Sequence, residues 1–324
     1  MGALPETVQF PAKESTRVEY GKILAQLGEE HPEIVVLDAD LSGSTQTARF
    51  AKVFQDRFFN VGISEQDMMG TAAGLALGGK VPFASTFAIF ATGRAWEQVR
   101  QSIAYSSLNV KIVASHGGIT VGEDGGSHQS VEDLALMRVL PNMVVLVPSD
   151  GPETRAMVRW AATYQGPVYI RTSRIPFPVI HDEGYSFELG RGEVLREGDD
   201  VTLAGLGLMV HQCLAASELL AKQGVSARVI NLSCLKPLDW QLVVDSARIT
   251  GCMVTAEEHS ATGGLGSAVS EVLTEFYPVP LRRVAIRDTF GMSGKPDELL
   301  KHFGLTAEDV SKAALAVMAR KIRS

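Results

Sequence analysis

The sequence predicts an α/β protein with two domains, each built on a mainly parallel sheet flanked by helices. Three observations support this fold class. Short apolar runs rich in β-branched residues alternate with helical patterns, the alternation breaks near residue 180, and it then restarts. The 324 residues suffice for about two domains. We therefore expect a first domain at 1–180, a linker at 181–190 and a second domain at 191–324.

The first half alternates predicted strands with predicted helices. The last of these helices opens with Pro152, a residue favoured in the first turn of a helix. The predicted strands are Ile34–Leu37, Pro82–Ser85, Val110–Ala114, Met143–Val147 and Val168–Arg171, and the predicted helices are Glu65–Gly78, Arg94–Ser106 and Pro152–Tyr164.

The pattern breaks in IPFPVIHDEGY, residues 175–185, where two prolines and a glycine interrupt a polar stretch. The same alternation then resumes, and two further helices are expected to close the chain. The strands predicted here are Val201–Leu206, Ala227–Leu232, Met253–Ala256 and Leu281–Ile286, and the first helices are Met209–Lys222 and Leu265–Phe276.

Composition restricts the partners and the compartment. A net charge of −7 argues against a nucleic-acid partner, which requires a basic face. Cys213, Cys234 and Cys252 form no CxxC pair, so we expect neither a disulfide framework nor a zinc site, as in a reducing cytoplasm. The N-terminus lacks the pattern of a secretory signal, and the longest apolar stretch, Val201–Val210, is too short to cross a bilayer. We expect a cytoplasmic protein without a membrane partner.

The most informative segment is SHGGITVGEDGGSHQ, residues 115–129, directly after a predicted strand. It places two histidines, an aspartate and a glutamate among glycines, which allow backbone to turn sharply or approach a ligand. This predicts a site for an anionic, oxygen-rich ligand, and the alternative is a polar surface loop. The spacing of its four metal-ligating side chains does not resemble a helical HExxH motif, so we expect no metal site here.

Three further motifs have both a structural and a functional interpretation. Glu65 opens the small-residue helix in NVGISEQDMMGTAAGLA, where a carboxylate either caps the helix or exchanges a proton with a bound base. Phe87 and Phe90, in PFASTFAIF, are either core residues or a platform for a cofactor. GGLG at Gly263–Gly266 precedes a helix and could hold a phosphate, although the GxGxxG fingerprint is absent.

Together, GISEQDM, STFAIF, SHGGITVGEDGGSHQ and the pair Ser173–Arg174 resemble the C-terminal part of transketolase, a thiamine-diphosphate-dependent ketol transferase. The resemblance covers almost the whole chain and implies a pyrimidine-binding domain followed by the family's C-terminal domain. It implies that Glu65 hydrogen-bonds a ring nitrogen of the aminopyrimidine and that Phe87 and Phe90 pack around that ring. Asp124 would contact a substrate hydroxyl, and His128 would bind the substrate near the reacting carbon and move protons.

The resemblance also implies a clamp for the terminal phosphate of a sugar phosphate. Guanidinium groups and hydroxyls are suited to bind phosphate oxygens. One position departs from the family, because Gly93 stands where a further aromatic residue is often found. The clamp residues would be Arg17, Ser44, His116 and Arg174.

The family's diphosphate-binding GDG motif and the asparagine ligands to Mg²⁺ that follow it do not occur in this sequence. The resemblance therefore implies a separate N-terminal subunit that carries this motif and the Mg²⁺ ligands. With two copies of each subunit, thiamine diphosphate would lie between the partner and this chain. The small-residue helix after Glu65 is a candidate to line that interface, which we expect to be large and apolar.

The predicted function is the C-terminal subunit of a split transketolase that moves a two-carbon ketol unit from a ketose phosphate to an aldose phosphate. One alternative is the beta subunit of a 2-oxoacid dehydrogenase's decarboxylating component, which needs no phosphate clamp. Another is a fragment like deoxyxylulose-phosphate synthase, a family that tends to carry an Asp-Arg pair where this chain has Ser115 and His116. The last is a non-catalytic interaction subunit, which would not need Glu65, Asp124 and His128 together.

Overall fold

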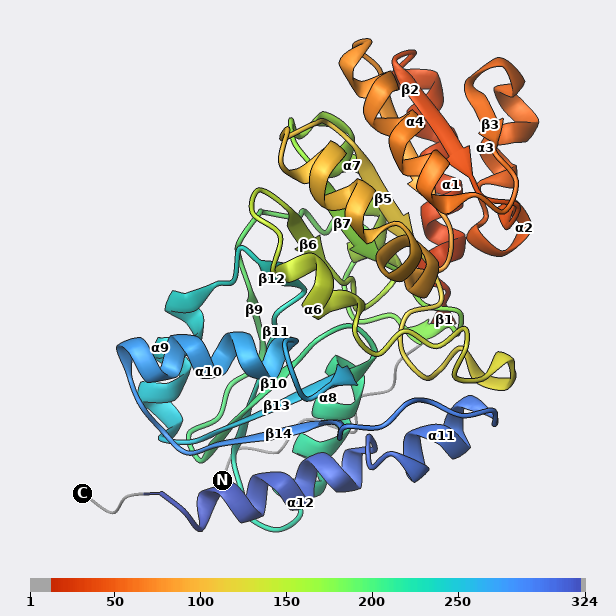
Figure 1. The fold of residues 1–324 in the computed structure, drawn as a ribbon. Helices are drawn as coiled ribbons and strands as arrows, with labels where there is room; N and C mark the ends of the chain where they lie inside the picture. The colour runs from red at the N-terminus through yellow and green to blue at the C-terminus, as the bar shows by residue number, and fades with distance from the viewer. Residues whose placement is uncertain (1–12, 322–324) are drawn as a thin grey trace.

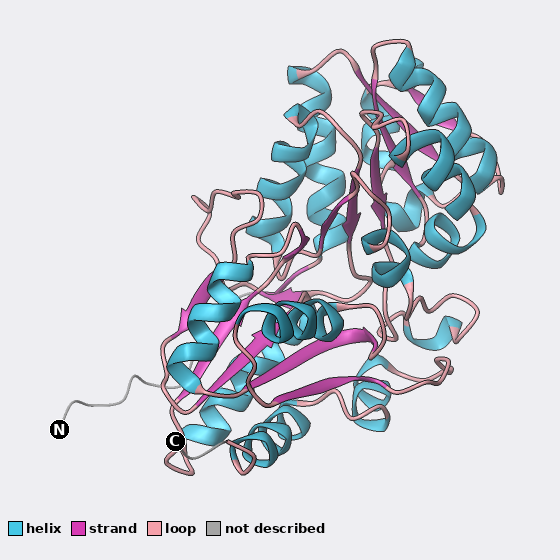
Figure 2. Ribbon diagram, turned by 60° about the vertical axis from the view of Figure 1, so that its left-hand side comes forward, coloured by secondary structure: helices cyan, strands magenta, loops and turns pink. Residues whose placement is uncertain are grey.

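The apolar runs form two separate sheets in the computed structural model, which describes residues 13–321 (Figure 1). Each sheet lies between helices, as Figure 2 shows with strands in magenta and helices in cyan. All residues of β2 (Ile34–Asp38) and β10 (Val201–Gly205) are buried, because helices cover both faces of the sheets. This burial explains why the parallel strands have continuous rather than alternating apolar sequences.

The first sheet has seven strands in the order β12-β6-β7-β5-β4-β2-β3. Its neighbours are parallel except for β12, which pairs antiparallel with β6. Its strands other than β2 are β3 (Phe58–Asn60), β4 (Val81–Ser85), β5 (Lys111–Ala114), β6 (Val144–Leu146), β7 (Val168–Arg171) and β12 (Cys234–Lys236). A separate antiparallel pair joins β1 (Lys13–Glu14) to β8 (Phe177–Pro178).

Helices α1 (Thr16–Glu30) and α7 (Gly151–Thr163) pack on one face of this sheet, and α4 (Glu65–Leu77) covers the other. The segment predicted as a helix at 94–106 is helical but wound differently. It consists of the π-helix η2 (Phe90–Arg94), one turn α5 (Trp96–Gln98) and a second π-helix η3 (Val99–Ala104). The shorter elements are α2 (Ser42–Thr45), α3 (Ala48–Val53), η1 (Gln55–Arg57), η4 (Gly122–Asp124) and α6 (Asp133–Arg138).

The second sheet has five strands in the order β14-β13-β10-β11-β9, and β9 alone runs antiparallel to its neighbour. Helices α8 and α12 pack on one face, and α9 and α10 pack on the other. The bounds are β9 (Glu193–Arg196), β11 (Ala227–Asn231), β13 (Met253–Ser260), β14 (Leu281–Ile286), α8 (Leu208–Ala221), α9 (Trp240–Thr250), α10 (Leu265–Phe276), α11 (Pro296–His302) and α12 (Ala307–Met318).

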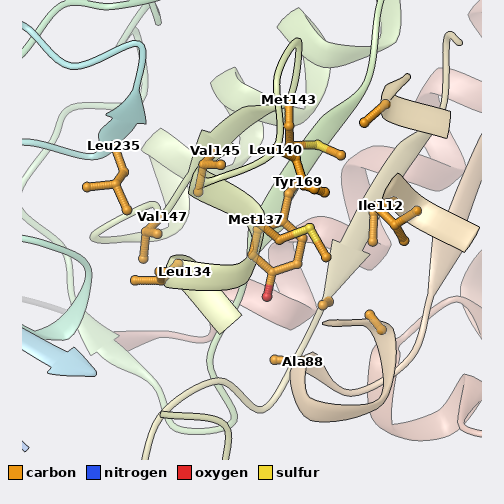
Figure 3. Packing of buried hydrophobic residues seen from close by; sticks show 14 of the residues in the cluster. Ala88, Ile112, Leu134, Met137, Leu140, Met143, Val145, Val147, Tyr169 and Leu235 are labelled. Atoms are coloured by element: carbon orange, nitrogen blue, oxygen red, sulfur yellow. The ribbon is translucent and has the colours of Figure 1, made fainter. Parts of the chain in front are cut away.

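Apolar packing continues from the first domain into the second. Val145 and Val147 of the first domain belong to the same hydrophobic cluster as Leu235 of the second (Figure 3). Leu235 lies on β12, the strand that the second half of the chain adds to the first sheet. The two sheets are therefore fixed relative to one another by shared core as well as by strand pairing.

A buried ion-pair network reinforces this joint. His181, in the connecting segment, lies with Nδ1 3.0 Å from Oδ2 of Asp150 at the start of α7 and Nε2 2.8 Å from Oε2 of Glu193 on β9. Burial opposes the charge of this histidine, but the two carboxylates outweigh burial and raise the pKa of His181 to about 10. His181 is therefore a cation at neutral pH and links both domains.

The predicted strands and helices are confirmed with shifts at their ends, except that the helix predicted at 94–106 is largely π-helical. Cys213, Cys234 and Cys252 are buried and free of disulfide bonds. Among the helices of residues 13–321, none has the length and apolarity that crossing a bilayer requires. The domain limits at 180 and 190 remain predictions.

Candidate active site

The residues singled out in the sequence gather at the carboxyl ends of the parallel strands of the first sheet. Glu65 follows β3, Phe87 follows β4, His116 follows β5 and Arg174 follows β7. Carboxyl ends of parallel strands meet at one edge of a sheet, which is where ligands bind in open α/β folds. The strand order therefore brings together side chains from segments far apart in the sequence.

Glu65 lies at the start of α4 and is only 4% exposed. Within the described residues, its carboxylate is bound by Arg94, whose Nη1 donates to Oε1 at 3.1 Å and to Oε2 at 3.4 Å, and not by backbone N–H groups of the helix. The Glu65 side chain therefore does not cap the helix. Arg94 thus supplies the opposite charge that this buried carboxylate requires.

Phe87, Phe90 and two histidines form an aromatic group beside Glu65. The ring of Phe87 stacks on His116 with a centroid distance of 3.8 Å and on Phe90 at 5.8 Å. His128 presents an edge to Phe90 at 5.4 Å. Phe87 is 5% exposed and Phe90 is half-buried, so Phe90 is the more accessible of the two rings.

Arg17 and Arg174 form a cationic group beside His116, near the aromatic rings. Burial, and then the nearby charges of Arg17 and Arg174, lower the pKa of His116 to about 3, so its imidazole is neutral at pH 7. Burial and the Arg174 charge likewise lower the pKa of Arg17. The Arg17 Nε is buried and has no hydrogen-bond partner among the described residues. A bound anion would relieve the repulsion between the two guanidinium groups.

Ser44 reaches this group through its backbone, because its carbonyl accepts a hydrogen bond from Arg17 Nη1 at 2.7 Å. The turn that carries Ser44 is held by Asp38, a buried residue at the end of β2. The Asp38 carboxylate accepts hydrogen bonds from Leu41 N at 2.6 Å and Thr45 Oγ1 at 2.7 Å. Asp38 thus fixes the position of the serine relative to the guanidinium.

The loop after β5 needs glycine at Gly118. Its φ is +81°, and a Cβ there would lie 2.3 Å from Cδ of Glu258. Glu258 accepts a hydrogen bond from the Thr120 N–H, and the Gln129 side chain donates to the carbonyls of Ile119 at 3.1 Å and Met292 at 2.9 Å. The second domain therefore holds this loop in place through Glu258 and Met292.

Asp124 and His128 lie in the same loop, on the open side of the site. The Asp124 carboxylate lies 3.7 Å from Nη1 of Arg174, which also donates to the Val121 carbonyl. His128 Nδ1 lies 3.0 Å from Ser127 Oγ. The structure thus brings Asp124 next to the cationic group and His128 next to the aromatic group.

The sequence interpretation missed Arg94, the partner of Glu65. The guanidinium of Arg94 lies 4.0 Å from the ring centroid of Phe90, four residues earlier in the same π-helix. A cation four residues after an aromatic residue on a helix was the available signal. Its pairing with Glu65, 29 residues away, could not be read from local sequence.

The glycines at 263–266 do not form a phosphate site. The backbone N–H groups of Leu265 and Gly266 donate to the carboxylate of Glu257 at 2.7 and 2.8 Å. This buried carboxylate already occupies the N-terminus of α10, where a phosphate would otherwise bind. The interpretation of GGLG as a phosphate cradle was therefore wrong, and Glu257 belongs to a buried polar cluster.

Comparisons with known proteins agree with this geometry. Residues 12–178 match the family model described as "Transketolase, pyrimidine binding domain", and residues 190–310 match "Transketolase, C-terminal domain". A protein of Methanocaldococcus jannaschii named as a transketolase C-terminal section is 49% identical over 94% of this chain and 96% of its own length. The 6-deoxy-6-sulfo-D-fructose transketolase subunit SqwH of Clostridium sp. is 46% identical over 94% of this chain and 95% of its own length.

Human transketolase is 39% identical over 95% of this chain, which spans only 50% of the human protein. Among solved structures, a split gene transketolase, described as an inactive beta4 tetramer, superposes with a TM-score of 0.89 at 55% identity. That match covers 95% of this chain and 99% of the other. Relatives of this chain therefore include both whole transketolases and polypeptides that correspond to their C-terminal part.

Proposed function

The chain belongs to the transketolase family, with its pyrimidine-binding and C-terminal domains, and we propose that it is the C-terminal subunit of a two-subunit transketolase. In this role it transfers a two-carbon ketol unit from a ketose phosphate to an aldose phosphate. The observation that carries the proposal is the buried carboxylate of Glu65 beside the half-buried ring of Phe90, next to a cationic group with an unsatisfied N–H.

These residues fit the aminopyrimidine of thiamine diphosphate. A planar, nitrogen-bearing ring needs an apolar face to stack on and a carboxylate to accept its N–H, and Phe90 and Glu65 offer both at one edge of the sheet. Bound thiamine diphosphate supplies the carbanion chemistry of ketol transfer. Glu65 holds a proton at the ring nitrogen, and Phe87 keeps the neighbouring rings in place.

The remaining residues act on the sugar. Arg17, Arg174 and the neutral His116 bind the terminal phosphate, together with Ser44. Asp124 accepts a hydrogen bond from a substrate hydroxyl, and His128 exchanges a proton near the reacting carbon. Because the phosphate lies far from the reacting carbon, the clamp contributes to substrate binding and therefore to KM.

The other half of the site belongs to a separate N-terminal subunit, which carries the GDG motif and the ligands of Mg²⁺. An exposed face of α4 supports this assignment, since a Cβ at Gly70 or Gly74 would meet no atom within 4 Å. Ile63 and Leu77 on this side are 73% and 75% exposed. Small residues that leave backbone open, flanked by exposed apolar side chains, suit close packing against another subunit. We propose two copies of each subunit.

Activity in pentose phosphate metabolism and a cytoplasmic location are part of the same proposal. The cationic clamp favours it over a 2-oxoacid dehydrogenase subunit, whose substrate has no phosphate, and His116 favours it over a deoxyxylulose-phosphate-synthase-like fragment. A non-catalytic subunit would have no use for a buried Glu65 beside the half-buried ring of Phe90.

The proposal is tested by ketol transfer from xylulose 5-phosphate to ribose 5-phosphate, with thiamine diphosphate and Mg²⁺. The assay compares the tagged chain alone with the complex it forms with a GDG-bearing partner. We expect transfer by the complex and none by the chain alone. A complex that binds the cofactor but transfers no ketol unit would contradict the proposed activity.

A further inference from the structure

Arg94 makes two contacts that together describe a flat, nitrogen-bearing ligand. Its guanidinium lies 4.0 Å from the ring centroid of Phe90, and its Nη1 donates to both carboxylate oxygens of Glu65 at 3.1 and 3.4 Å. A planar cation that stacks on an aromatic face while donating N–H groups to a carboxylate has the shape and polarity of an aminopyrimidine protonated at a ring nitrogen. We infer that Arg94 is a placeholder that occupies the position of the cofactor's aminopyrimidine and must leave when the cofactor binds. This inference rests on the proposed function of Glu65.

The burial of Glu65 gives a physical reason for a placeholder. The carboxylate is 4% exposed, and a buried carboxylate without a partner is strongly unfavourable. In the chain without cofactor, Arg94 supplies the opposite charge and the hydrogen bonds that the carboxylate needs. A ring N–H of the cofactor would take over the same role, so the carboxylate is never left unpartnered.

The surroundings of Arg94 allow its side chain to move. The side chain is 51% exposed, so one side of the guanidinium already faces solvent. Gly93 precedes it, and a Cβ there would have only Ile89 Cδ1 within 4 Å, at 3.7 Å, which leaves room beside the backbone. The backbone is held, because the Arg94 carbonyl accepts a hydrogen bond from Gln66 Nε2 at 3.0 Å. The side chain can therefore swing out while the π-helix stays in place.

Cofactor affinity tests the placeholder directly. The experiment titrates thiamine diphosphate, at saturating Mg²⁺, into the complex of this chain with its GDG-bearing partner, by isothermal calorimetry and by stopped-flow fluorescence. Arg94→Met removes the ion pair and the charged stacking but keeps an unbranched side chain. Arg100→Met is the matched control, since Arg100 is an exposed arginine of η3 that donates to its neighbour Gln101.

We expect the Arg94→Met complex to bind thiamine diphosphate roughly tenfold more tightly than the wild type and to associate faster, because an ion pair whose arginine is half exposed and one cation–π contact no longer compete. Arg94→Lys keeps the charge but not the planar guanidinium, so its affinity for thiamine diphosphate should lie between those of the wild type and Arg94→Met. Arg100→Met should match the wild type. Thermal unfolding of each variant confirms that it is folded.

Equal or weaker binding by folded Arg94→Met would overturn the inference, because Arg94 would then not compete with the ring. Failure of the wild-type complex to bind thiamine diphosphate at all would overturn the proposed function and the placeholder with it. The two failures are distinguishable, since the first occurs in an enzyme that still binds its cofactor.

Discussion

Replacing Arg174 with alanine tests the phosphate clamp, and the structure sets the size of the effect. The side chain is 33% exposed, and its Nη1 lies 3.5 Å from Glu123 and 3.7 Å from Asp124, so part of its charge is already balanced. A charge-assisted hydrogen bond contributes about 1.5–3 kcal/mol, and partial exposure places Arg174 at the lower end. A loss of about 1.5–2 kcal/mol corresponds to a roughly 10- to 30-fold rise in KM for a phosphorylated ketose.

The assay compares KM and kcat of the complex for xylulose 5-phosphate and for unphosphorylated xylulose. The KM for xylulose should change by less than about threefold, and kcat should stay close to wild type, because a contact to the distant phosphate binds ground state and transition state alike. Arg282→Ala, an exposed arginine on β14, is the control. An equal loss for both substrates would refute the clamp.

Three further substitutions probe the catalytic group, the domain joint and the loop. Glu65→Gln should lower kcat at least about 100-fold without changing the thermal midpoint, because an amide does not exchange a proton with the ring, and near wild-type turnover would exclude the assigned role. His181→Gln tests the raised pKa of His181. Since the folded-state pKa of about 10 exceeds the ordinary 6.5, the stabilisation is complete below pH 6.5 and is lost as the pH rises to about 10. The difference in unfolding free energy between wild type and His181→Gln should therefore shrink by roughly 2 kcal/mol from pH 7 to 9 in urea titrations, and a constant difference would contradict the ion pair. Gly118→Ala should destabilise the chain by about 2 kcal/mol or more because of its positive φ and the Glu258 contact, whereas Gly70→Ala, with open space in α4, should be neutral or slightly stabilising. Equal thermal midpoints for the two glycine variants would argue against the loop geometry.

Much of the fold could be predicted because helices cover both faces of the sheets. Strands such as β2 and β10 are buried throughout, so their apolar runs stand out from the helices around them. The antiparallel addition of β12 to the first sheet could not be predicted, because three residues after a long excursion through the second domain carry no local sign of their partner. The π-helical winding of residues 90–104 likewise depends on packing and not on helical pattern.

The site residues that follow strands could be predicted from the sequence. Glu65, His116 and Arg174 each stand just after a strand, and parallel order alone brings them to one edge. The pairing of Arg94 with Glu65 and the capping of α10 by Glu257 could not be predicted from the sequence, because both depend on side chains that meet only in the folded chain. Sequence therefore indicated which groups gather, whereas the structure identified which of them pair with one another.

We propose that this chain holds one half of a thiamine diphosphate site and that a second subunit completes it. The most direct measurement is a calorimetric titration of thiamine diphosphate with Mg²⁺ into the chain alone, the GDG-bearing partner alone and their mixture. We expect saturable binding of one cofactor per pair of subunits in the mixture, with binding at least about 100-fold weaker in either subunit alone, a difference that corresponds to about 3 kcal/mol. Equally tight binding by either isolated subunit, or no binding by the mixture, would contradict it.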